Sequence, residues 1–106
     1  MAANRRLAFQ AVGSLAFGSL PAAYADLLPN VKGRGIILIF TNTLNSDATI
    51  SFDDGTTDCL ILPAGQGLVL DLSANNGEFS GTIQAKRGPS GASTAGQLNC
   101  SVIRVQ

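Results

Sequence analysis

The 106-residue sequence has no histidine and no tryptophan, and its aromatic residues are five phenylalanines and one tyrosine. Without histidine there is no imidazole base and no Ser–His–Asp triad. None of the many serines lies in a nucleophile-elbow motif, and no Gly-rich loop opens a helix after a strand. We therefore expect no catalytic residue and no cofactor, and the sequence predicts a protein that is not an enzyme.

Charged residues are also scarce, at 13% of the chain, and the formal net charge is zero. A neutral chain lacks the basic surface that binds nucleic acid, so we expect no nucleic-acid partner. The charges are segregated: residues 1–46 have four basic and one acidic residue, residues 47–78 have six acidic and no basic, and residues 79–106 have three basic and no acidic. Copies of the chain could dock acidic loops against basic ones. Alternatively, aspartate simply collects in turns.

The only two cysteines, Cys59 and Cys100, fall in predicted strands at a spacing that suits no zinc site. We expect two buried, inert thiols if the protein is assembled in a cytoplasm, and a disulfide is possible in an oxidising compartment. The acidic stretch Asp53–Asp58 could offer oxygen ligands to calcium, but its spacing does not match a calcium loop. A hairpin turn explains it, so no metal site is predicted.

The stretch from Ile36 to Leu72 is the centre of the predicted fold. Its first run, Ile36–Phe40, is continuously apolar, which predicts a strand covered on both faces. Residues 48–53 alternate, which predicts a strand with one solvated face. Turn signals at Asp54-Gly55 and at Pro63-Ala64-Gly65 separate the later runs Cys59–Leu62 and Gly67–Leu72. These four strands are predicted to form a meander.

The remaining segments extend this pattern. Strands are predicted over Phe79–Lys86 and Leu98–Val105, with Leu98, Cys100 and Val102 on one face. Residues 27–35 are predicted as a connection, and residues 87–96 as a loop that is mobile or held by a partner. The sequence therefore predicts one all-β domain over residues 1–106, an antiparallel β-sandwich or jelly roll of about seven or eight short strands.

The N-terminal segment has two interpretations. A basic start, an apolar stretch and Ala23-Tyr24-Ala25 are typical of a secretory signal ending at residue 25. Polar and small residues interrupt the apolar stretch, so we expect the segment to be retained, and it is too short and interrupted for a transmembrane helix. We predict an extended N-terminal arm over residues 1–11 and a first strand near Val12–Leu20. The arm lies either on a neighbouring subunit or on its own domain as an edge strand.

Several strand and turn motifs carry a family resemblance over roughly residues 12–106. They are an apolar strand, an Asn, the pattern I-S-F-D-x-G, a strand ending L-P-A-G, a strand ending L-D-L, and a C-terminal strand. Here these are Ile36–Phe40, Asn42, Ile50–Gly55, Leu60–Gly65, Leu68–Leu72 and Cys100–Val105. The chain resembles small structural proteins encoded by tailed bacteriophages, and this family supplies no catalytic residue.

The resemblance implies a virion component, assembled in the host cytoplasm and present in many symmetric copies. It would be a capsid decoration or cement protein, or part of the head–tail connector or tail. Its partners would be the major capsid, portal, adaptor or tail proteins and copies of itself, with no membrane. The predicted contact residues lie in the arm and in the loop: Arg5, Arg6, Leu7, Phe9, Arg87 and Pro89.

Two alternatives remain open. The first is a secreted or periplasmic β-sandwich binding module that loses residues 1–25 and pairs Cys59 with Cys100. The second is a small hydrolase or lyase, which would require Asp53, Asp58 and Asp71 to converge in one pocket.

Overall fold

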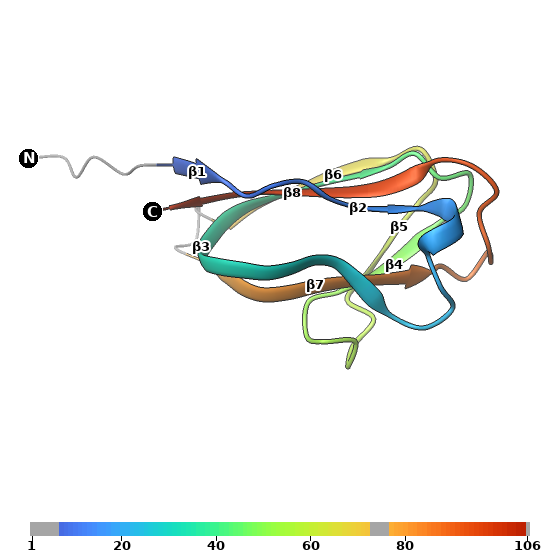
Figure 1. The fold of residues 1–106 in the computed structure, drawn as a ribbon, viewed down its shortest axis with the longest axis horizontal. Helices are drawn as coiled ribbons and strands as arrows, with labels where there is room; N and C mark the ends of the chain where they lie inside the picture. The colour runs from blue at the N-terminus through green and yellow to red at the C-terminus, as the bar shows by residue number, and fades with distance from the viewer. Residues whose placement is uncertain (1–6, 73–76, 106) are drawn as a thin grey trace, which may run out of the picture.

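The computed structural model describes residues 7–72 and 77–105, and antiparallel β-strands dominate it (Figure 1). The strands are β1 (Leu7–Phe9), β2 (Gly13–Ala16), β3 (Ala25–Asn42), β4 (Ala48–Ser51), β5 (Leu60–Leu62), β6 (Gly67–Asp71), β7 (Phe79–Arg87) and β8 (Gln97–Val105). A 3-10 turn, η1 (Phe17–Ser19), follows β2. Within the described ranges no helix is long and apolar enough to cross a membrane. The predicted all-β antiparallel fold is confirmed.

The strands form two layers that share β3. The first half of β3 pairs with β7, which pairs with β4, and β4 pairs with the edge strand β5. The second half of β3 lies between β6 and β8, and β8 also pairs with β1 and β2. Figure 1 shows β3 passing along one layer and then turning into the other.

The connection predicted over residues 27–35 is wrong, because this segment is part of the 18-residue strand β3. Its pairing with β7 shifts register three times, and Asn30 has a positive φ of 56°. β-Bulges of this kind absorb residues that do not fit a regular ladder, such as Pro29, which has no N–H to donate. In this segment, proline and glycine therefore mark bulges within a strand. They do not mark a break between strands.

The predicted four-strand meander is also wrong. β4 pairs with β5 as expected, but β3 pairs with β6 and not with β4. The connections 43–47 and 63–66 cross from one layer to the other. Each layer can then turn one apolar face toward the shared core, which a single flat meander could not do.

The solvated face predicted for residues 48–53 is not present in β4, where all four residues are buried. Thr49 pairs opposite Ile61 and Lys86, whose side chains flank it on the outer face of the layer. Ser51 lies under the following loop and accepts a hydrogen bond from the Gly55 N–H at 3.0 Å. A loop folded back over the strand thus replaces solvent, which strand alternation alone does not reveal.

The core lies between the two layers. Its fully or nearly fully buried apolar members are Leu20, Leu27, Leu28, Val31, Leu38, Phe40, Leu44, Ala48, Ile50, Leu62, Ile83, Ala85, Leu98, Cys100 and Val102. The predicted alternation in β8 is confirmed, since Leu98, Cys100 and Val102 are all buried. In the run Ile36–Phe40, Leu38 and Phe40 are buried and the other three residues are half-buried, so the predicted complete cover of both faces is not reached.

The turn predictions are confirmed in their backbone conformation. Asp54 and Gly55 have φ values of 58° and 79°, and Gly65 has a φ of 73°. The β4–β5 connection is nevertheless a long loop, and Cys59 lies at its end just before β5. The predicted first strand over residues 12–20 is shorter, ending at Ala16 before the 3-10 turn.

Candidate assembly surfaces

Strand β6 forms an exposed edge of the sandwich. Within the described ranges it pairs only with β3, so its outer row of backbone N–H and C=O groups faces away from the sheet. Val69, in the middle of β6, is 61% exposed. A free edge with an apolar side chain is a ready template for another strand.

An apolar cleft opens beside this edge, between the two layers. It has a volume of about 210 Å³, and five of its six lining residues are apolar: Leu38, Phe52, Leu70, Leu72 and Phe79, with Glu78 as the sixth. The rings of Phe40, Phe52 and Phe79 form an edge-to-face series with centroids 6.0 and 5.8 Å apart. The cleft therefore lies at the margin of the core, beside the partly buried side chains of Phe52, Leu70 and Phe79.

The N-terminal segment lies along the opposite edge of the same layer. β1 pairs with β8 through Leu7↔Val105 and Phe9↔Ile103, so residues 7–9 form an edge strand on their own domain. Phe9 is 75% exposed and Val12 is 61% exposed. Burying one such side chain stabilises by about 1.5–3 kcal/mol. The predicted contact residues Arg5 and Arg6 lie outside the described residues.

Arg87 and Pro89, the two predicted contact residues outside the arm, lie near the start of β8, at the end remote from β1. Arg87 is held within the chain: its Nε donates to the Leu20 carbonyl oxygen at 3.2 Å, and its N–H donates to Pro21 at 2.9 Å. Pro89 is exposed in the loop that precedes β8. Because β1 contacts the end of β8 and this loop precedes its start, the arm and the loop do not form one surface.

The loop 88–96, which was predicted to be mobile or held by a partner, is held by hydrogen bonds within its own chain. Asp47 Oδ1 accepts hydrogen bonds from the Ser90 N–H and hydroxyl. Asn45 Oδ1 accepts from the Ser93 hydroxyl and the Thr94 N–H. The polar side chains of the 43–47 connection thus replace the apolar contacts that the loop lacks.

The acidic loop between β4 and β5 is stabilised by internal hydrogen bonds. Asp58 accepts from the Tyr24 hydroxyl and lies 3.2 Å from Lys86 Nζ, and these two contacts lower the pKa of Asp58. Burial and the contact with Asp58 raise the pKa of Tyr24. Hydrogen bonds from Thr57 and Ser51 lower the pKa of Asp53. Lys86 also lies over the Tyr24 ring, with its Nζ 4.7 Å from the ring centroid. The aspartates of this loop therefore hold its conformation through hydrogen bonds and an ion pair.

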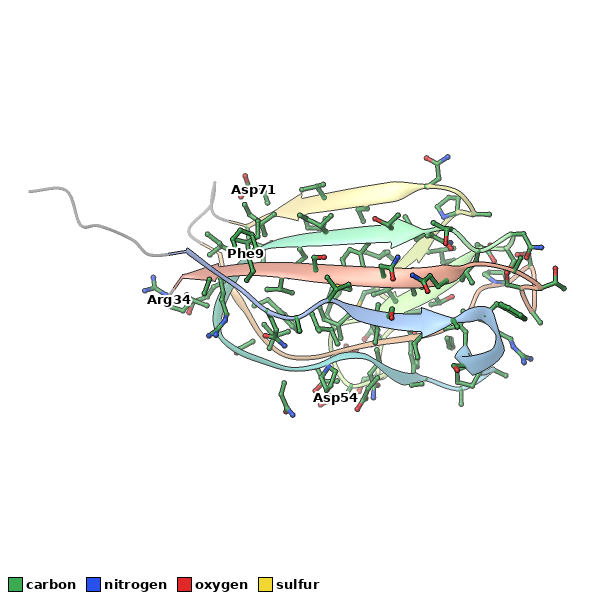
Figure 2. All side chains as sticks on the ribbon, turned by 45° about the horizontal axis from the view of Figure 1, so that its top comes forward. Phe9, Arg34, Asp54 and Asp71 are labelled. Atoms are coloured by element: carbon green, nitrogen blue, oxygen red, sulfur yellow. The ribbon has the colours of Figure 1, made fainter. Side chains whose placement is uncertain are left out.

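The three aspartates that a hydrolase would bring together have separate surroundings. Asp53 and Asp58 belong to the acidic loop, whereas Asp71 ends β6 opposite Ile37. Figure 2 shows Asp71 and Asp54, a member of the acidic loop, on opposite sides of the molecule. Among the described residues no group of three or more His, Cys, Asp or Glu side chains could hold a metal ion.

The cysteines differ from each other. Both are free; Cys100 is buried in the core, but Cys59 is exposed, so the prediction of two buried thiols is wrong for Cys59. Burial raises the pKa of Cys100 to about 12. The pairing of Cys59 with Cys100 in the secreted alternative is absent, because one thiol lies between the layers and the other on the surface.

The sequence alone did not indicate Val69 or the apolar cleft as parts of a candidate surface. Val69 lies between Leu68 and Leu70, so an apolar run conceals which of the three faces outward. The cleft is built from four separate segments, and no local pattern announces it.

Comparisons with known proteins identify no family for this chain. No family model matches it, and no curated protein matches it. A search of solved structures finds a similar chain, described by the words "Bacillus endospore appendages form a novel family of disulfide-linked pili". The two chains share 14% sequence identity over 99% of this chain and 95% of the other, with a TM-score of 0.55. At this identity the likeness shows a shared fold.

Proposed function

We propose that this protein is a structural subunit that acts by docking with further copies of itself in a regular assembly, and that it catalyses no reaction. The observation that carries the proposal is the open edge of β6, which borders an apolar cleft through Leu70 on its inner face and presents exposed Val69 on its outer face. Both features favour strand addition by a neighbouring chain, because backbone pairing and apolar burial occur at the same place.

Three further observations support this proposal. The exposed apolar side chains Phe9, Val12 and Val69 lie on edge segments of one layer. The low share of charged residues leaves few groups that oppose association. The solved chain with a similar fold is described as forming pili, which are polymers of repeated subunits. A contact between two different surfaces of identical chains generates a ring or an open filament.

Two locations fit this mechanism. One is a filamentous appendage, in line with the similar solved chain. The other is the virion of a tailed phage, which the family resemblance implies and where the partners would include capsid, connector or tail proteins. The virion location stays a prediction, and electron microscopy of particles and cell surfaces from the source organism distinguishes the two.

The test is self-assembly of the purified protein, followed by sedimentation velocity and negative-stain electron microscopy over a range of concentrations. We expect ordered oligomers or filaments from the wild type. Val69→Lys should suppress them, because a charge on an edge strand opposes strand addition. Ile61→Lys is the matched control, since Ile61 is 50% exposed on β5, the edge of the other layer. A wild type that stays monomeric at every concentration would refute the proposal.

A further inference from the structure

The cleft beside β6 has the size and lining of a site for one aromatic ring. Its volume is about 210 Å³. A closed cavity of about 150 Å³ lined by Leu, Ile and Phe side chains takes up benzene. The cleft also continues the edge-to-face series of Phe40, Phe52 and Phe79, whose spacing of about 6 Å a further ring could match. A phenylalanine ring is thus one side chain whose size and apolar character suit this cleft.

Only two of the five phenylalanines are largely exposed, Phe9 at 75% and Phe17 at 45%. Phe9 lies at the cleft end of the molecule, because Phe9, Ile103, Ile37 and Asp71 form one cross-strand row. Figure 2 shows Phe9 and Asp71 at the same end. Phe17 follows β2 at the other end, where its N–H donates to Gly96.

The ring cannot come from the same chain. Phe9 and Asp71 are three strands apart in this row, roughly 14 Å at about 4.8 Å per strand. Directly opposed residues share a face, so Phe9 points to the face of Ile37, whereas its neighbour Leu38 lines the cleft on the other face. The occupant must come from a second molecule.

We infer that the Phe9 ring of a second copy of this chain occupies the apolar cleft between β6 and β7, with its N-terminal segment added along the free edge of β6. This inference rests on the proposed self-assembly and names the contact that produces it. β1 is only three residues long, so exchanging β8 of its own chain for β6 of a neighbour breaks few backbone pairs.

The one acidic residue that lines the cleft, Glu78, is ion-paired with Arg34 of the same chain, whose Nε lies 2.9 Å from its Oε2. Apolar burial and strand pairing, and not charge, therefore select the occupant.

The decisive experiment places the photo-crosslinker p-benzoylphenylalanine at position 9 in full-length protein and mixes isotope-labelled with unlabelled copies. After irradiation, we expect cross-linked peptides of mixed label that join position 9 to the segments containing Leu70, Leu72 or Phe79. Cross-links confined to β8 of the same chain, or to another surface of the second copy, would overturn the inference.

Association measurements give a second test. Phe9→Ala should weaken assembly by roughly 10- to 100-fold, as expected for an anchoring aromatic residue. Phe17→Ala is the matched control and should assemble like the wild type. Leu70→Phe, which fills the cleft from inside, should weaken assembly as Phe9→Ala does, with thermal melting as the check on folding. If the wild type assembles and Phe9→Ala assembles equally well, this inference fails while the proposed function stands. A wild type that never assembles refutes both.

Discussion

Asn42 and Leu62 join the two layers of the sandwich. Asn42 ends β3 in one layer and is 1% exposed, and its Nδ2 donates to the Leu62 carbonyl oxygen at the end of β5, in the other layer, at 3.0 Å. The same amide donates to Pro63 and Ser46, and its Oδ1 accepts from the Leu44 N–H at 2.9 Å. One side chain thus satisfies backbone groups of the two connections 43–47 and 63–66.

Replacing this side chain should therefore destabilise the fold. Asn42→Ala leaves buried carbonyl groups and the Leu44 N–H without the amide, which should lower the free energy of unfolding by roughly 2–3 kcal/mol. Urea unfolding followed by circular dichroism measures the loss. Asn99→Ala, on the half-buried face of β8, is the control and should cost less than about 1 kcal/mol. Equal losses in the two variants would contradict the role assigned to Asn42.

The two thiols should differ strongly in reactivity. Native protein treated with iodoacetamide at about pH 8 should be alkylated at the exposed Cys59 and not at Cys100. With its pKa raised to about 12, Cys100 has roughly one thiolate in ten thousand at that pH, and the core shields it. Peptide mass spectrometry identifies the modified residue, and alkylation in denaturant should modify both. Rapid native alkylation of Cys100 would show that β8 is not packed in the core.

Acid should weaken the contact between Asp58 and Tyr24. Because the hydrogen bond from Tyr24 and the nearby Lys86 lower the pKa of Asp58, the ionised carboxylate stabilises the folded state. This stabilisation is present above the unfolded pKa of about 3.9 and is lost as the pH falls through the lower folded value. Thermal melting between about pH 2 and pH 7 should show a smaller acid-induced decrease in Tm for Asp58→Asn and for Tyr24→Phe than for the wild type. Parallel Tm curves for all three proteins would be evidence against this contact.

The sequence predicted local features well where they depend on a few neighbouring residues. Apolar runs and alternation located β7 and β8 closely, and Asp54-Gly55 and Gly65 marked positive φ angles. It failed for residues 27–35, where Pro29 and the glycines suggested a connection. Pairing with β7 from a distant part of the chain holds that segment as a strand, and bulges absorb the residues that do not fit.

The candidate surfaces were only partly predictable. Phe9 was identified in advance because it lies in an apolar segment near the N-terminus. Arg87 was also selected, but Leu20 and Pro21 hold it, a contact between residues 66 and 67 positions apart that no local motif encodes. Val69 and the cleft were missed because exposure depends on which strand becomes an edge.

The sequence by itself determined that this chain forms short antiparallel strands, because apolar periodicity and turn chemistry act within a few residues. It also determined that histidine chemistry is absent and that the charges are segregated. Only the tertiary structure decided that β3 belongs to both layers, that β6 is an edge, and that an apolar cleft lies beside it. These features arise from pairings between distant segments, whose burial and register depend on the packing of the two layers as a whole.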